Sequence, residues 1–171
     1  MLRTLCRDDI MSLESQIAGW AKNCQRLVIL GIGNTLRGDD AVGVEIVKNL
    51  SGKAPSRVKV IDCGTVPENF LHELESFKPT HVLMIDAAHL EMAPGKTRLI
   101  PPEKIAGIAL STHSMPLSLL AGIIKQELKA EVILLGIQPD NTTFGEGLSP
   151  KLQKAAKHIT ENIKEAIAGL D

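Results

Sequence analysis

The sequence predicts a three-layer α/β/α fold, in which helices cover both faces of a twisted, mostly parallel sheet of five strands. Three observations lead to this fold class. Short runs rich in β-branched residues recur along the chain, most intervals between them have helical periodicity, and one interval is too short to hold a helix. The expected strands are residues 26–30, 57–61, 81–85, 97–100 and 131–137.

The first expected element is a helix that precedes the sheet. In residues 9–23, apolar side chains recur at three- and four-residue spacing from Ile10 to Trp20, a pattern typical of an amphipathic helix. We expect residues 1–24 to form a helical N-terminal extension that docks onto the core. Residues 25–171 then form a single α/β domain, because a chain of this length fits one core.

Two crossover helices should follow the first two strands. The first runs from about residue 40 to residue 50, has a wide apolar face rich in valine, and stops at Ser51-Gly52. The second begins at Pro67-Glu68, a proline and an acid that suit a first helical turn. Both are ordinary right-handed βαβ connections, so the strands that they join are parallel.

The strand at residues 97–100 is expected to be antiparallel. Only about ten residues separate it from Asp86, which is too few for a crossover through a helix. An antiparallel strand ends at the lower edge of the sheet, so residues 101–112 must climb back to the upper edge. This return places His113 at the upper edge.

The last part of the chain completes the alternation of strands and helices. A helix is expected over residues 115–128, with Pro116 in its first turn, and it leads into the last strand. A C-terminal amphipathic helix is expected over residues 149–167.

Composition and charge exclude several classes of partner. The formal net charge is −1 and the basic residues are scattered, so a surface for nucleic acid is not expected. The apolar runs fall far below the roughly 18–20 residues of a bilayer span, and the N-terminus lacks the apolar core of a secretory signal. We therefore expect a cytoplasmic protein without membrane insertion. Cys6, Cys24 and Cys63 have no C-x-x-C spacing, which argues against disulfides and structural zinc.

Three carboxylates follow the first three strands. Asp40, Asp62 and Asp86 stand at or just beyond the carboxyl ends of these strands. In open α/β sheets, ligands bind outside this edge. Each aspartate taken alone is more simply a helix cap or a turn residue, but three together favour a site.

The segment GIGNTLRGDD, residues 31–40, resembles a phosphate-binding loop but ends in two acids. The third glycine of a dinucleotide fingerprint is replaced by Leu36, and a pyrophosphate here would face Asp39 and Asp40. The Walker pattern is absent because Gly38 is followed by an aspartate, not a lysine. The loop therefore favours a cation.

Histidine supplies a further donor. His113, in STHSMP, is the histidine that the predicted topology brings to the same edge, although taken alone it could be a loop or cap residue. His72, His81 and His158 lie within helix or strand patterns and are interpreted as structural, whereas the role of His89 is left open. Two carboxylates and one imidazole suit nickel, zinc or a related divalent ion with open coordination positions. The common zinc-protease and serine-hydrolase motifs are missing.

Five segments in order resemble the hydrogenase maturation endopeptidases, which trim the C-terminus of the large subunit of nickel–iron hydrogenases. The segments are LGIGNTLRGDDAVG, VIDCGTVPEN, MIDAA, STHSMP and LLGIQPD, and the resemblance covers about residues 26–168. STHSMPLSLL together with GIQPD resembles the subgroup that serves formate-hydrogenlyase-type or related energy-converting hydrogenases.

The resemblance implies that Asp40, Asp86 and His113 bind nickel or a surrogate divalent metal, and these are the residues that the topology brings together. It further implies that nickel is recognised in the substrate and is not a permanently held cofactor. Asp39 is then a neighbour or a helix cap, and Asp62 is a conditional addition to the site.

The glycines of the loop then have a structural role. Gly31, Gly33 and Gly38 allow a tight, closely approached backbone, while Asp40 turns a would-be anion site into one arm of a cation clamp. Two features depart from the family pattern. Cys63 stands where many relatives have a second glycine, and the N-terminal extension lies outside the resemblance.

The leading hypothesis is an aspartyl-type endopeptidase that acts, as a monomer, on the nickel-loaded large-subunit precursor and removes a C-terminal peptide. A carboxylate could act as general base toward a water, and Asp40, Asp62 and Asp86 are all candidates. The alternative is a nickel-sensing chaperone or binding module that never cuts, which needs the same ligands. A third hypothesis, a nucleotide-dependent enzyme, is opposed by the acids that end the glycine-rich loop.

Overall fold

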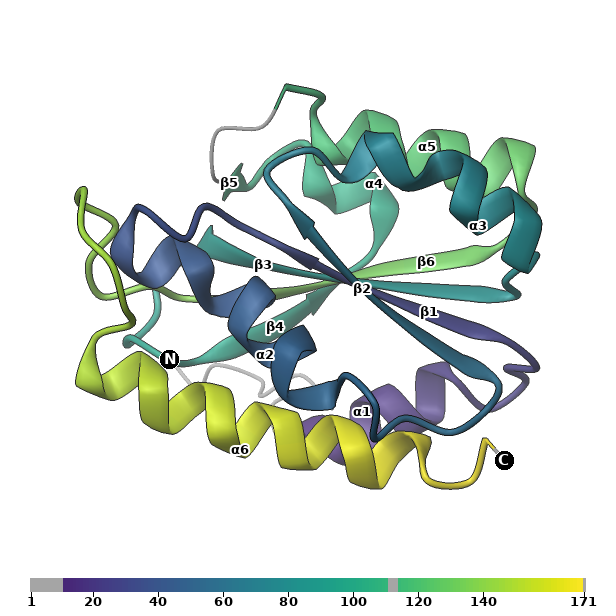
Figure 1. The fold of residues 1–171 in the computed structure, drawn as a ribbon, viewed down its shortest axis with the longest axis horizontal. Coiled ribbons are helices and arrows are strands. Elements are labelled where there is room, and N and C mark those ends of the chain that lie inside the picture. Colours follow the sequence, from purple (N-terminus) through teal and green to yellow (C-terminus); the bar gives the residue numbers. More distant parts are fainter. Residues whose placement is uncertain (1–10, 111–113, 171) are drawn as a thin grey trace, which may run out of the picture.

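The computed structural model describes residues 11–110 and 114–170, and it has the predicted three-layer architecture (Figure 1). Within these residues, the sheet has six strands in the order β2-β1-β3-β6-β4, and β5 pairs with β3 outside this order. The strands are β1 Leu27–Ile32, β2 Val58–Gly64, β3 His81–His89, β4 Thr97–Ile100, β5 Ala109–Leu110 and β6 Glu131–Ile137.

The strand directions bring several strand ends to one edge of the sheet. β1, β2, β3 and β6 are parallel neighbours, so their carboxyl ends meet at the same edge of the sheet. β4 is antiparallel to β6, with Thr97 opposite Ile137, which confirms the prediction from its short connection. β5 is antiparallel to the end of β3, with Leu110 opposite Ala88. Sequence patterns do not predict β5, because two residues are too few to show a periodicity.

Helices cover both faces of the sheet (Figure 1). One layer holds α1, α2 and α6, and the other holds α3, α4 and α5. The helices are α1 Leu13–Trp20, α2 Val42–Leu50, α3 Leu71–Phe77, α4 Pro102–Ile105, α5 Leu117–Glu127 and α6 Pro150–Ile167, and the 3-10 turns η2 Gly38–Ala41 and η3 Pro67–Phe70 lead into α2 and α3.

The central strands are buried on both faces, as the apolar runs predict. All six residues of β1 are buried, and alternate residues enter different cores. Leu27 and Ile29 pack with α1, α2 and α6, whereas Val28 and Leu30 pack with the opposite helical layer. This two-sided burial is what fixes the register and hence the positions of the strand ends.

The two helices at the ends of the chain pack on each other. In α1, Ile17 is fully buried in the core shared with α6, and Trp20 packs edge-on against His81 with ring centroids 5.0 Å apart. The predicted helix over residues 9–23 is therefore confirmed in its central part, while residues 9 and 10 lie outside the described residues. α6 begins after its N-cap Ser149, as predicted.

The predicted start of helix α5 is wrong by two residues. Helix α5 begins at Leu117, and Pro116 is its N-cap with an extended backbone at ψ 132°, whereas a start at residue 115 was expected. Proline disfavours the helical conformation in the residue before it, so Met115 does not start the helix, and Pro116 itself is extended as the N-cap.

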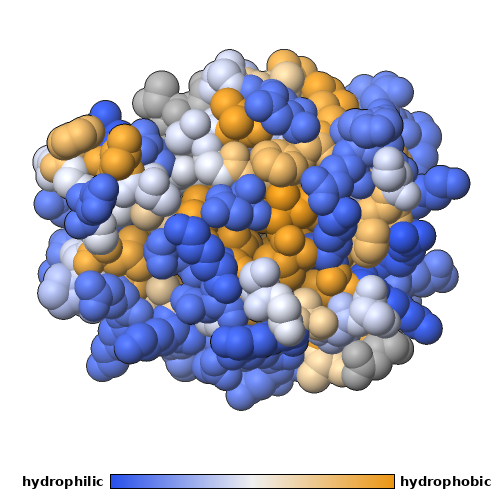
Figure 2. Space-filling view, viewed as in Figure 1, coloured by the Kyte–Doolittle hydropathy of each residue, from blue (hydrophilic) through white to orange (hydrophobic). Residues whose placement is uncertain are grey.

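The outer face of α6, at the bottom of Figure 2, is hydrophilic. Among the described residues, no helix is both long enough and apolar enough to cross a membrane.

Candidate functional site

Glycines let the turn after β1 fold back against η2. Gly33 has φ +152°, and a Cβ at this position would lie 1.9 Å from the carbonyl oxygen of Asp40. Gly38 has φ +52°, and a Cβ there would lie 2.6 Å from the carbonyl oxygen of Asn141. Only glycine fits such conformations and such contacts, so the expected close backbone approach is confirmed.

Asp40 is held inside this turn. The residue is 5 % exposed, and its Oδ2 accepts a hydrogen bond of 3.1 Å from the backbone N–H of Asn34. Its position in η2 does not make it the cap of α2, because the N-cap is Ala41 and no side chain caps that helix. Asp40 therefore does not cap α2, although the sequence leaves that role open.

Asp86 lies in β3 and is fully buried. It is paired in register with Gly136 of β6. The start of α2 rests on the same part of β3, because a Cβ on Gly43 would lie 2.2 Å from the carbonyl oxygen of Ile85. Asp40 and Asp86 are thus carried by chain segments that touch each other at the carboxyl edge of the sheet.

Asp62 has a different environment. It is exposed at the end of β2, and its Oδ1 accepts a hydrogen bond of 3.0 Å from the N–H of Gly64. This is the geometry of a carboxylate that stabilises its own turn. This hydrogen bond is the one expected if Asp62 is a turn residue, which is an interpretation that the sequence allows.

His113 lies outside the described residues, but the chain on either side of it is described. Leu110 pairs with Ala88 near the end of β3, so the return of residues 101–110 to this edge is confirmed. The hydroxyl of Ser114 donates to Oε1 of Glu68, which lies in η3 after β2. The chain therefore leaves β5 and enters α5 at the same edge.

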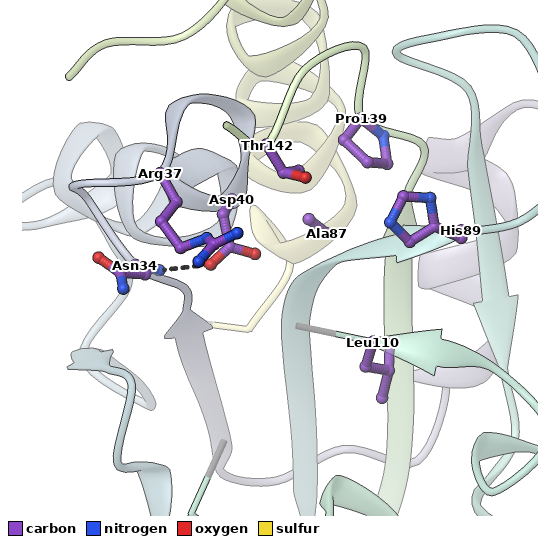
Figure 3. A pocket seen from close by; sticks show the side chains of 8 residues that line it. All are labelled: Asn34, Arg37, Asp40, Ala87, His89, Leu110, Pro139 and Thr142. Carbon is purple, nitrogen blue, oxygen red and sulfur yellow. Dashed lines mark hydrogen bonds between the residues drawn. The ribbon is translucent and has the colours of Figure 1, made fainter. Parts of the chain in front are cut away.

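A pocket of about 340 Å³ opens beside Asp40 (Figure 3). Figure 3 shows the side chains of Arg37 and Asp40 turned toward each other on one wall and His89 on the opposite wall. The residues that line the pocket are Asn34, Arg37, Asp40, Ala87, His89, Leu110, Pro139 and Thr142.

Sequence reasoning left four polar residues of this pocket unassigned or open. Asn34 and Arg37 lie within GIGNTLRGDD, and their place in that loop is the signal that could have found them. Thr142 lies in the loop after β6 and carries no motif that sequence analysis can read. His89, whose role the sequence leaves open, is a pocket residue.

Asp39 ties the loop after β6 to the glycine-rich turn. It is fully buried and accepts four hydrogen bonds, from the N–H groups of Asp140 (2.9 Å), Asn141 (2.8 Å) and Ser149 (2.7 Å) and from the Ser149 hydroxyl (2.9 Å). The backbone adds N–H to carbonyl bonds from Asp39 to Asn141 (2.9 Å) and from Gly38 to Gly145 (2.7 Å). Asp39 therefore joins two loops that form the pocket wall.

The remaining titratable groups near the core have structural roles. Burial lowers the pKa of His81, which lies at the opposite edge of the sheet against Trp20. Burial, followed by the negative charges of Asp62 and Glu73, raises the pKa of Cys63 to about 12. Cys63 is therefore a neutral thiol near pH 7, which makes it a poor nucleophile.

His72 and His158 also fit their structural interpretation, since both lie within helices, α3 and α6. Cys24 and Cys63 are free thiols, while Cys6 lies outside the described residues. Within residues 11–110 and 114–170, no group of three or more His, Cys, Asp or Glu side chains is arranged to hold a metal ion.

Comparison with known proteins identifies hydrogenase maturation proteases among the relatives of this chain. A family model described as hydrogenase maturation protease matches residues 44–166. A putative hydrogenase maturation protease of Methanocaldococcus jannaschii is 43% identical over 131 residues, which are 72% of this chain and 78% of that protein. The hydrogenase 3 maturation protease of Escherichia coli is 33% identical over 138 residues, which are 80% of this chain and 88% of that protein.

A solved structure has the same fold. The crystal structure of a NiFe hydrogenase maturation protease, HycI, from Thermococcus kodakarensis matches with a TM-score of 0.83 and 33% identity. The match covers 90% of this chain and 99% of that one.

Proposed function

Because the chain belongs to the hydrogenase maturation protease family, we propose that it removes a C-terminal peptide from the nickel-loaded large-subunit precursor of a nickel–iron hydrogenase. Family membership makes it a peptidase, and hence a hydrolase. The relatives that support this substrate include the hydrogenase 3 maturation protease of Escherichia coli. The proposal further includes action as a monomer in the cytoplasm.

The observation that carries the proposal is the placement of two buried carboxylates on touching segments beside a pocket. Asp40 lines the pocket, and Asp86 is buried in β3 next to the pocket residue Ala87. A carboxylate in this position can accept a proton from a water that attacks a peptide bond. The proposed chemistry is therefore of the aspartyl type, with Asp40, Asp86 and His113 as the residues that carry it.

Nickel enters the proposal as part of the substrate. Carboxylate oxygen and imidazole nitrogen suit a divalent ion of the nickel or zinc kind, and three protein donors leave coordination positions open. Those positions can be filled by groups of the precursor that already hold the ion. Recognition of the precursor would then depend on its being loaded, since a ligand shared between two proteins stabilises only the complex that contains it.

The test is the mass of the large-subunit precursor after incubation with the purified protein. We expect nickel-loaded precursor to lose a short C-terminal peptide, and precursor prepared without nickel to keep its full mass in chelator-treated buffer. An unchanged mass with stable complex formation would contradict cleavage and support the binding-module alternative. Equal cleavage of the two precursors would contradict recognition of nickel.

Single-residue variants assign the residues. Asp40→Asn, Asp86→Asn and His113→Ala should each lower the cleavage rate by about two orders of magnitude or more, because general-base and positioning roles have effects of this size. Asp62→Asn is the matched carboxylate control, because Asp62 is exposed and its Oδ1 accepts a hydrogen bond from the N–H of Gly64 in its own turn. Unfolding midpoints separate loss of chemistry from loss of fold. Cleavage at the wild-type rate by a variant would remove that residue from the site.

A further inference from the structure

An exposed apolar pair stands beside the pocket. Among the large hydrophobic residues that the structure describes, Phe144 is the most exposed, at 83 %, and Leu36 is 47 % exposed. Figure 2 shows an apolar protrusion at the upper left, in the region of the loop between β6 and α6. Single exposed apolar residues are common, but a phenylalanine this exposed in a loop gains nothing from burial in its own fold.

The two residues belong to segments that are bonded to each other. The N–H of Gly145 donates to the carbonyl oxygen of Leu36 (2.9 Å), and the N–H of Gly38 donates to the carbonyl oxygen of Gly145 (2.7 Å). Arg37 and Gly145 form a parallel bridge. Leu36 and Phe144 are therefore carried by neighbouring backbone segments, which together form a rim of the pocket.

Both segments are further held by side chains. Oδ1 of Asn34 accepts from the N–H of Leu36, and Oδ1 of Asn141 accepts from the N–H of Thr143, each at 2.9 Å. The four hydrogen bonds of Asp39 fix the base of the second loop. A surface that is ordered before binding loses less conformational entropy when a partner arrives, which favours affinity.

The apolar pair is continuous with the candidate site. Arg37, which lines the pocket, follows Leu36 in the chain, and Thr142, which lines the same pocket, precedes Phe144 by two residues. A partner that sends a peptide segment into the pocket is therefore brought next to this rim. The partner that the proposed function brings to the pocket is a whole protein, which can cover the rim while its end is bound.

We infer that Leu36 and Phe144 form an apolar docking surface that receives an apolar side chain of the large-subunit precursor, next to the segment that enters the pocket. The inference rests on the proposed function for the identity of the partner. It assigns specificity to residues outside the carboxylate site, and it places the contact on the loops that also line the pocket.

The experiment measures cleavage kinetics and direct binding of nickel-loaded precursor with the wild type and with Leu36→Ser, Phe144→Ser and the double variant. We expect Phe144→Ser to raise KM and Kd about tenfold, equivalent to about 1.4 kcal/mol, with kcat within about twofold of the wild type. Phe144→Leu should restore most of the affinity, because the surface requires apolar area and not an aromatic ring. Met11→Ser is the control, since Met11 is 46 % exposed and lies beside α1, outside both loops.

Each result separates the inference from the proposed function. An unchanged precursor mass with wild-type protein refutes the proposed cleavage, while weaker precursor binding by Phe144→Ser would still support the docking surface. Normal wild-type cleavage with an unchanged KM and Kd for the double variant refutes the docking surface and leaves the function intact. A concentration-dependent dimer that only Phe144→Ser abolishes, with KM unchanged, would assign the pair to a second copy of this chain and overturn the inference.

Discussion

Replacing Asp39 by alanine should destabilise the protein strongly, although Asp39 is not a proposed catalytic residue. The carboxylate is fully buried and accepts from three backbone N–H groups and one hydroxyl of the loop that ends at α6. Alanine would leave these four donors without their acceptor. A buried donor that loses its partner costs the fold its full desolvation penalty, which is larger than the net gain from an ordinary hydrogen bond.

The size of the effect follows from the four contacts. Hydrogen bonds to a charged group contribute roughly 1.5–3 kcal/mol each, but water can reach part of this partly buried loop and satisfy some donors. We therefore expect Asp39→Ala to lower the free energy of unfolding by about 3–5 kcal/mol, a loss comparable to breaking a buried ion pair. For a domain of this size, the melting temperature should fall by about 6–20 °C.

Urea unfolding measured by circular dichroism tests this value. An unchanged m-value would show that the variant exposes the same amount of surface on unfolding as the wild type. Asp62→Ala is the matched control: Asp62 is exposed and its carboxylate accepts a hydrogen bond within its own turn, so a loss of about 1 kcal/mol or less is expected. A loss below about 1 kcal/mol for Asp39→Ala would refute the reasoning, because it would show that the loop does not depend on this carboxylate.

Three further perturbations follow from the structure. Gly33→Ala places a Cβ 1.9 Å from the carbonyl oxygen of Asp40, so it should lower the free energy of unfolding by about 2 kcal/mol and reduce cleavage. The control Gly19→Ala has open space around it and should be neutral or slightly stabilising. Urea unfolding of the two variants compares these values. The thiol of Cys63, with its pKa raised to about 12, should resist iodoacetamide at about pH 8 until denaturant is added. Mass spectrometry of the Cys63 peptide measures the labelling, and complete labelling of the native protein would contradict this prediction. Burial lowers the pKa of His81 below its ordinary 6.5, so the unfolded chain binds a proton more readily than the folded one. The free energy of unfolding should therefore fall as the pH drops below about 6.5, and His81→Gln should weaken this dependence. An identical pH profile for the wild type and the variant would contradict this role of His81.

The sequence predicts the fold well because burial leaves a strong periodic signal. Strands 97–100 and 131–137 are found within their predicted bounds, and the antiparallel direction of the first of them follows from a connection too short for a helix. What the periodicity misses is short: α4, with four residues, β5, with two, and the start of α5 at Leu117. Elements of this size are fixed by tertiary pairing and by proline geometry, which no local pattern reports.

The candidate site shows the same division between local and distant information. Asp40 and Asp86 can be placed at one edge from sequence alone, because parallel strands bring their carboxyl ends together. Thr142 and Phe144 cannot, because they come from a loop about a hundred residues further along the chain than Asp40, and only the folded hydrogen bonds bring that loop to the pocket. The assignment of His113 stays a prediction, since it lies outside the described residues.

The two adjacent aspartates of the GDD motif explain why a loop that resembles an anion site ends in acids. Backbone N–H groups of the kind that bind phosphate elsewhere are present here, but in the loop after β6 three of them are directed at the carboxylate of Asp39. Asp39 is thus the anion of this structure, supplied by the protein itself, and it holds the two loops together. The next residue, Asp40, is left on the pocket wall by the same turn, because Gly33 and Gly38 allow the backbone to fold tightly beneath it. One carboxylate therefore organises the rim that carries Leu36 and Phe144, and its neighbour lines the pocket.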